Sequence, residues 1–297
     1  MRQTSQVPRI RLDLAYDGGG FTGWAKQPGL RTVQGELESA LTTIFRRGGV
    51  APGVNVAGRT DVGVHATGQV AHLDLGDAQL ADLDRPRRGG SGPTGLDALV
   101  RRLNGIAGAA GDVIVQRATV APPGFDARFA ALWRRYEYRI ADARALRDPR
   151  RRGFELGHPT ALDEDAMRDA ASSLLGLHDF ASFCRPREGA TTIRTLQEFD
   201  WARDADGVLV ARVQADAFCH SMVRALVGAC LAAGDGRLAA GRAAQLRDAA
   251  ARTSEFVVVP AKGLTLVGVG YPPDGELAAR AEQTRAKRSF DDSGSTD

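Results

Sequence analysis

Residue types whose spacing could do chemistry are concentrated in one stretch, from Val56 to Gln69. It reads VAGRTDVGVHATGQ and places the carboxylate of Asp61 next to an arginine and among glycines. Glycines at this density favour a tight backbone turn, so the acid is expected in a loop. The alternation from Val70 to Leu75 predicts a strand directly after it. A strand that follows at once would hold the loop carboxylate rigidly.

A simpler interpretation makes Arg59 and Asp61 a solvated ion pair in a glycine turn, and an isolated R-x-D would favour it. The length of the pattern changes that preference. The run GRTDVGVHATGQVAHL resembles the signature of the tRNA pseudouridine synthase A family, in which the aspartate of G-R-T-D-x-G-V-H-A is catalytic. Val62 stands where the family usually has alanine, which leaves the chemical groups of the signature in place.

The resemblance extends from about Ile10 to Tyr271. It covers three further blocks, which read YDGGGFTGW with RTVQG between 16 and 35, FDARF with RRYEY between 125 and 138, and FCHSMVRALVG between 218 and 228. The chain departs from the family pattern at Ala25, Asp126 and Ala225. The glycine-rich YDGGGFTGW also suggests a phosphate loop, but it lacks the G-K-[ST] of a nucleotide-triphosphate site.

The resemblance implies three catalytic residues, which are Asp61, Tyr136 and Arg224. Asp61 would act at the ribose, either by attacking C1′ or by removing the 2′ proton, and the sequence does not choose between these routes. Tyr136 would stack on the target uracil and assist proton removal at C5. Arg224 would pair with Asp61 across a cleft and favour its charged form.

Each of these residues also has an ordinary structural interpretation. A loop aspartate is more often a turn or cap residue, and Tyr136 with Tyr138 would form one apolar face of a strand. Arg224, in the apolar helix HSMVRALVG, would extend its charge to the solvent at the helix rim. Only the surrounding family pattern favours the catalytic roles.

Four residues are expected to bind the substrate RNA, which are Arg59, Arg134, Arg135 and His65. By resemblance, Arg59 would expel the target base and fill its place in the stack, or else bind phosphate. Only three of the 39 basic residues are lysines, and arginine suits phosphate, although genome composition alone could explain this preference. Arginine runs at 85–88, 134–135 and 147–152 could line a nucleic-acid path.

Composition excludes several classes of protein. With 43% hydrophobic and 25% charged residues and a net charge of +3, the chain is expected to be globular and soluble. The N-terminus lacks the apolar core of a signal peptide, so we expect a cytoplasmic protein. Three cysteines, Cys184, Cys219 and Cys230, have no zinc or disulfide spacing and are expected to be reduced and mostly buried. No metal or other cofactor is expected.

Two successive blocks that mix strands and helices predict an α+β fold with two similar lobes. By resemblance, these are α/β lobes with mainly antiparallel sheets that flank a basic central cleft. The expected domains are 1–118 and 119–272, followed by a disordered tail at 273–297. The segment 84–95 is expected to be a mobile loop. Expected helices are 33–47, which Thr32 would cap and Gly48-Gly49 would stop, 96–103, 163–175 with Asp163 as its cap, 220–233 and 239–252. Expected strands are 9–16, 54–56, 70–75, 112–118, 133–140, 196–202, 208–215 and 264–271, and a hairpin turn around Asp204–Gly207 would join the strands 196–202 and 208–215.

By resemblance, the protein is a cofactor-free isomerase that converts uridine to pseudouridine at positions 38, 39 and 40 of the tRNA anticodon stem-loop, working as a homodimer. A base in a stem must be flipped out before a carboxylate can reach its sugar. Two alternatives remain: a non-catalytic tRNA-binding or chaperone protein on the same scaffold, and a nucleoside hydrolase using Asp61.

Overall fold

The computed structural model describes residues 7–46, 49–85, 93–185 and 191–285. The chain divides into two compact units, Met1–Leu132 with Val269–Arg285, and Trp133–Gly268. This division differs from the expected boundary at 118/119, because residues 121–130 share a small core with the C-terminal segment. Helix α7 (Leu277–Arg285) belongs to that core, so the expected disordered tail is wrong for these residues. Residues 286–297 lie outside the described part.

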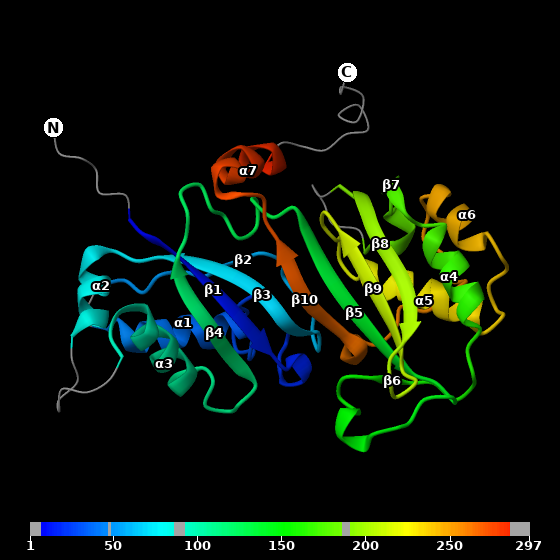
Figure 1. Cartoon of the computed structure of the whole chain (residues 1–297), viewed down its shortest axis with the longest axis horizontal. Coiled ribbons are helices and arrows are strands. Elements are labelled where there is room, and N and C mark those ends of the chain that lie inside the picture. Colours follow the sequence, from blue (N-terminus) through cyan, green and yellow to red (C-terminus); the bar gives the residue numbers. More distant parts are fainter. Residues whose placement is uncertain (1–6, 47–48, 86–92, 186–190, 286–297) are drawn as a thin grey trace. The chain divides into compact units, whose positions relative to one another are not determined.

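The first unit contains strands β1 (Arg9–Tyr16), β2 (Asn55–Val56), β3 (His65–Asp74) and β4 (Val113–Val120), in the order β4-β1-β3 with β2 on β3 (Figure 1). All of these pairs are antiparallel. The alternation of β1 buries its apolar face, as predicted, and exposes the intervening residues in part. Strand β3 begins five residues earlier than the expected Val70 and therefore includes the end of the signature stretch.

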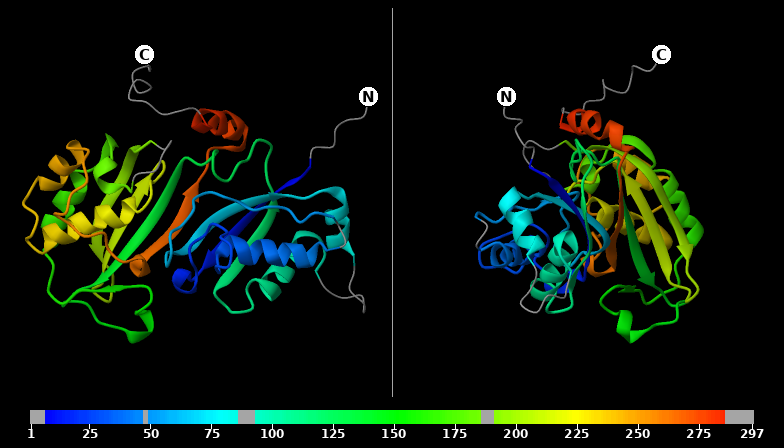
Figure 2. Two further views of the ribbon diagram at one scale, coloured as in Figure 1. Left: turned by 180° about the vertical axis from the view of Figure 1, so that it is seen from behind. Right: turned by 60° about the vertical axis from the view of Figure 1, so that its left-hand side comes forward.

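The helices of this unit are α1 (Val33–Ile44), α2 (Asp77–Asp84) and α3 (Gly95–Ile106), with a 3₁₀ turn η1 (Gly18–Gly20) before α1 and η5 (Asp274–Glu276) before α7. Helices α1 and α3 lie on one face of the strands (Figure 2). Thr32 caps α1 as predicted, because its hydroxyl oxygen accepts a hydrogen bond from Gly35 N at 3.2 Å. Helix α2 was not expected. Residue 48, part of the expected stop of α1, lies outside the described residues. So do residues 86–92 of the expected mobile loop.

The opposite face of β1 and β3 is covered by the small core around Phe125, Tyr271 and α7. His72 is 2% exposed there, and its Nδ1 accepts a hydrogen bond from Ala127 N at 3.0 Å. An imidazole that accepts at Nδ1 in this way is neutral. Burial, with the charge of Arg9, lowers the pKa of His72 from 6.5 to about 4.

Because His72 is buried and neutral, we expect the free energy of unfolding to depend on pH. Between pH 6.5 and about 4 the unfolded chain binds a proton at His72 that the folded protein does not, so stability falls as the pH falls through this window. We expect the loss to reach at most about 3 kcal/mol. In His72→Asn the amide oxygen can replace Nδ1 as acceptor but cannot titrate. Denaturant unfolding at pH 7 and pH 4.5 should therefore show a smaller difference for this variant, and an equal difference would contradict the prediction.

The second unit contains strands β5 (Trp133–Ala141), β6 (Leu156–Gly157), β7 (Gly176–Asp179), β8 (Ile193–Arg203) and β9 (Leu209–Ala215), in the order β5-β9-β8-β7 (Figure 1). These pairs are antiparallel, and β6 pairs with β5 in parallel. β10 (Leu264–Gly270) crosses the boundary between the units. The prediction of helices with mainly antiparallel strands is confirmed, whereas β7 was not expected.

The helices of the second unit are α4 (Glu164–Ser172), α5 (Met222–Gly234) and α6 (Arg242–Asp248), with 3₁₀ turns η2 (Pro149–Arg151), η3 (Ala181–Phe183) and η4 (Ala261–Gly263). Helix α4 packs against α5 and β8. Asp163 caps α4 as predicted, because its carboxylate accepts from the backbone of Asp165 and Ala166. The helix ends at Ser172, three residues before the expected Leu175.

A buried ion pair joins Asp142, the residue after β5, to Arg203 at the end of β8. Asp142 is fully buried and accepts two hydrogen bonds from Arg203, at 2.9 and 2.8 Å. Burial alone would raise the pKa of Asp142, but the bonds from Arg203 and from the backbone of Leu162 and Arg144 lower it to about 2. Arg203 also donates to Glu164, so the pair fixes the start of α4.

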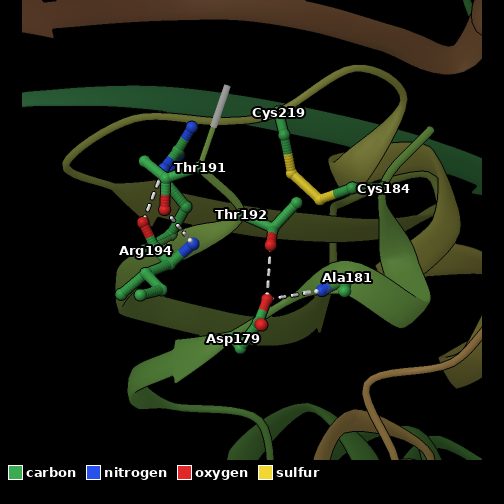
Figure 3. The surroundings of a disulfide bond; sticks show 8 residues. Asp179, Ala181, Cys184, Thr191, Thr192, Arg194 and Cys219 are labelled. Atoms are coloured by element: carbon green, nitrogen blue, oxygen red, sulfur yellow. Dashed lines mark hydrogen bonds between the residues drawn. A yellow bond between two sulfur atoms is a disulfide. The ribbon is translucent and has the colours of Figure 1, made fainter. Parts of the chain in front are cut away.

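The expectation of three reduced cysteines is wrong for two of them. Cys184 and Cys219 form a disulfide, with their Cα atoms 5.7 Å apart (Figure 3). They lie 35 residues apart in the sequence, and the fold brings them together where Arg185 N donates to His220 O at 3.0 Å. Spacing alone could not reveal this tertiary contact. Cys230 is free and buried, as predicted, and burial raises the pKa of its thiol to about 12.

Candidate active site

Asp61 lies in the connection between β2 and β3. The turn is closed by a hydrogen bond from Val64 N to Asp61 O at 3.2 Å, and Gly63 adopts a φ of 76°, which an L side chain rarely tolerates. The predicted tight turn is confirmed. Asp61 is half-buried, whereas Arg59 and Val62 are exposed. The Val62 side chain is 59% exposed, so this departure from the family pattern adds a methyl-rich surface beside the acid rather than a buried clash.

A buried polar group supports the turn on its N-terminal side. Tyr16 and Thr60 share a hydrogen bond of 2.8 Å between their hydroxyl oxygens. Gln69 Nε2 donates to the Tyr16 hydroxyl at 3.1 Å and to Gly58 O at 2.9 Å. Tyr16 is 5% exposed, Thr60 6% and Gln69 0%, so water has little access to these hydrogen bonds.

The C-terminal side of the turn rests on the η1 segment. A Cβ added to Gly18 would stand only 2.0 Å from Val64 O, so any side chain there would displace the turn. The backbone N–H of Gly18 donates to Nδ1 of His65 at 3.0 Å. His65 is 2% exposed, and its burial gives no support to the expected RNA contact. We assign His65 to holding the loop.

The opening family block supplies a further support. Trp24 N donates to Thr60 O at 3.0 Å, and the buried Trp24 ring lies 5.9 Å from that of Tyr16. The glycine-rich sequence that suggested a phosphate loop therefore packs around the Asp61 turn. Its glycines allow close backbone approach rather than phosphate binding.

Arg59 is the exposed cation of the turn. Among the residues that the structure describes, no hydrogen bond or ion pair is found for its side chain, although Asp61 is two positions away in the sequence. The alternative of a structural Arg59–Asp61 ion pair thus lacks support in this conformation. An exposed guanidinium next to a half-buried carboxylate suits contact with a nucleic acid.

Tyr136 lies in the middle of β5 in the second unit. It is 7% exposed and packs edge-on against Phe218, with ring centroids 5.2 Å apart and an interplanar angle of 87°. Phe218 comes from the loop that leads into α5. The structural alternative, in which Tyr136 and Tyr138 share one buried face of the strand, matches what is seen.

Arg224 lies in the first turn of α5 and is half-buried. Its Nε donates to Val259 O at 2.6 Å, which fixes the side chain against the segment before η4. Burial raises the pKa of Tyr138, and the positive charge of Arg224 opposes that rise, so the guanidinium acts on the buried interior of this unit. A purely solvent-directed arginine would have neither of these interactions.

Arg134 and Arg135 point to opposite faces of β5. Arg134 is 7% exposed, on the Tyr136 face, and donates to Asp216 O at 2.8 Å. Arg135 lies on the other face, 3.2 Å from Glu198 and 5.1 Å from the Trp133 ring. The two arginines cannot serve one RNA path as neighbours, because a strand alternates its side chains. RNA binding by either stays a prediction.

Two further features concern the residues that the structure describes. No group of three or more His, Cys, Asp or Glu side chains within them could hold a metal ion. Within the same residues, no helix is long and apolar enough to cross a membrane.

The residues Tyr16, Gly18, Thr60 and Gln69 belong to the family motifs, but their supporting roles were not predicted from the sequence. A signal was present for Gln69, which is a polar residue at the start of an apolar strand, where an unpaired amide would be costly. Its partners could not be inferred, because they come from β1 and from the loop after β2. The site is therefore a half-buried carboxylate on a turn that is fixed on both sides.

A carboxylate presented on such a turn can act as a nucleophile or as a general base. The sequence model of a family described as tRNA pseudouridine synthase matches residues 170–272. Curated proteins named tRNA pseudouridine synthase A match nearly the whole chain. The protein from Leifsonia xyli subsp. xyli is 62% identical over 97% of this chain and 100% of its own length. Those from Frankia casuarinae and Streptomyces griseus subsp. griseus are 55% and 52% identical over 96% of this chain, covering 97% and 96% of their lengths. The chain belongs to the tRNA pseudouridine synthase A family.

Proposed function

We propose that this protein is an isomerase that converts uridine to pseudouridine in tRNA, with Asp61 as the catalytic carboxylate. The observation that carries the proposal is the Asp61 turn, in which the family signature supplies the acid and the opening block supplies groups that fix it. The names of the relatives support the reaction and the tRNA substrate.

The reaction requires no change in oxidation state. The bond between N1 and C1′ breaks, the uracil turns, and a bond between C5 and C1′ forms. C5 loses its hydrogen as a proton, and N1 gains one. Asp61 would either form a transient ester at C1′ or remove the 2′ proton, and a carboxylate can do both. Tyr136 would stack on the base and assist the loss of the C5 proton.

Arg224 is proposed to favour the charged form of Asp61, because a nearby cation stabilises a carboxylate. Arg59 would enter the stack when the target base flips out, since its side chain is exposed beside the acid. Two similar lobes around a basic cleft, uridines 38, 39 and 40 as targets, a homodimer and a cytoplasmic location are further proposals, and they rest on the family resemblance.

Mapping pseudouridine at nucleotide resolution tests this function. An unmodified tRNA with uridines at positions 38, 39 and 40 should gain pseudouridine there, and a transcript with cytidine at these positions should gain none. A tRNA-binding or chaperone protein would bind the transcript and leave every uridine unchanged. A hydrolase would leave abasic sites and free uracil. Either of these last outcomes would contradict the proposal.

A further inference from the structure

We propose that Tyr16, Thr60 and Gln69 are positioning residues for Asp61, joined in a hydrogen-bond chain with a fixed direction from Gln69 through Tyr16 to Thr60. The inference rests on the proposed role of Asp61 and adds three residues that do not touch the substrate. All of its contacts lie within the first unit.

The direction of the chain follows from Gln69. Its Oε1 accepts from Val70 N at 3.2 Å, and its Nε2 donates to Gly58 O, which can only accept. The amide group is therefore oriented without ambiguity. Its second N–H points to the Tyr16 hydroxyl, so that oxygen accepts from Gln69 and donates its own hydrogen to Thr60 Oγ1.

The chain keeps this direction over a wide pH range. Burial raises the pKa of Tyr16 to about 12, so the hydroxyl retains its hydrogen at neutral pH. The three side chains are almost completely buried, so water cannot replace a bond that is removed. Each bond therefore contributes to the placement of the loop as well as to its stability.

The chain ends one residue before the acid. Thr60 is held through its side chain by Tyr16 and through its carbonyl by Trp24 N, at 2.8 and 3.0 Å. Gly58 O is held by Gln69 on the other side of Arg59. Asp61 thus leaves a backbone that is fixed at two points, and small displacements of a reacting group are costly to the rate.

Tyr16→Phe and Thr60→Val remove the same hydrogen bond from its two ends while keeping similar shapes. We expect each variant to lower the single-turnover rate at saturating tRNA by about 10- to 100-fold. The double variant should be no slower than the slower single variant, because the bond is already lost. The tRNA dissociation constant should change less than about twofold, since none of these residues contacts the RNA.

Two variants serve as controls. Tyr271→Phe removes a hydroxyl that donates to Ala127 O at 2.7 Å in the same unit, in the small core around Phe125 and α7. It should lose stability but retain the wild-type rate. Thr60→Ser keeps the acceptor and should also retain the rate. All variants are compared well below the melting temperature of the least stable one, so that loss of folding does not enter the rates.

Three outcomes would overturn the inference. They are wild-type rates in both Tyr16→Phe and Thr60→Val, rate losses that add fully in the double variant, or an equal loss in Tyr271→Phe. Asp61→Asn is measured in parallel. If Asp61→Asn keeps its activity, the proposed function fails. If it is inactive while Tyr16→Phe and Thr60→Val are fully active, only the positioning role fails.

Discussion

Replacing Asp61 by asparagine is expected to abolish pseudouridine formation while leaving the fold and tRNA binding nearly unchanged. The amide has the size of the acid, but it is neither a nucleophile nor a base, so neither chemical route remains open. The turn is held by backbone hydrogen bonds of Thr60, Asp61 and Val64 and by the Thr60 hydroxyl, all of which asparagine at position 61 retains. We expect the single-turnover rate to fall by about 10³-fold or more.

Asp74→Asn is the matched control in the same unit. Asp74 ends β3 and pairs with Arg9 at 2.8 Å, with 45% of its side chain exposed, so its loss should affect activity little. Pseudouridine formation, the melting temperature and the tRNA dissociation constant are measured for both variants. Turnover in Asp61→Asn at a rate close to that of Asp74→Asn would remove Asp61 from its catalytic role.

Arg224→Met is expected to reduce the rate at saturating tRNA by about 10²-fold or more, with a smaller effect on affinity. Methionine fills similar space in the apolar surroundings of α5 but carries no charge to favour an ionised carboxylate. It also loses the bond from Nε to Val259 O, so the comparison needs a variant that keeps the charge. Arg224→Lys should recover part of the rate, because lysine is cationic but lacks the guanidinium fork.

Arg242→Met provides the corresponding surface control. Arg242 lies at the start of α6 and pairs with Glu255 at 2.6 Å, with both side chains about 40% exposed, and it should keep full activity. Rates are measured at saturating tRNA, and affinity is measured separately. If Arg224→Met weakens tRNA binding but keeps the rate, Arg224 is a phosphate contact and its proposed electrostatic role is wrong.

Elements with strong local signals were predicted well from the sequence. The alternation of Arg9–Tyr16 and Trp133–Ala141 identified β1 and β5, and the cap residues Thr32 and Asp163 marked the starts of α1 and α4. The turn between β8 and β9 was also found where expected, because Asp204 and Gly207 are turn-forming residues. These signals depend on neighbouring residues only.

Features that depend on distant contacts were missed. Helix α7 has almost no amphipathic pattern, and it is ordered through Leu277 and Ala281, which pack with residues 121–130. Strand β3 starts at His65 because β1 pairs with Ala66, although the threonine and glycine that follow resemble a loop. The Cys184–Cys219 bond also depends on tertiary contact.

The candidate site was predictable in part for the same reason. Family resemblance placed the acid at Asp61, and the glycines around it predicted the turn. The chemical type of a residue does not tell whether it faces the solvent or holds the loop. His65 was therefore expected to contact RNA, whereas it is buried and its Nδ1 accepts a hydrogen bond from Gly18 N. The burial of the side chain makes that distinction, and the sequence does not reveal burial for a polar residue in a motif.

Release of the hydrogen on C5 tests the central claim most directly, because joining C5 to the ribose must expel it. A tRNA carrying tritium at uracil C5 should release label to water without added nucleotide or metal, up to the number of modified sites, and Asp61→Asn should release none. A tRNA-binding protein would leave the label in the RNA, and a hydrolase would release it on free uracil. If the protein is folded and binds tRNA, but no tritium appears in water with any tRNA tested, the proposed isomerase activity is contradicted.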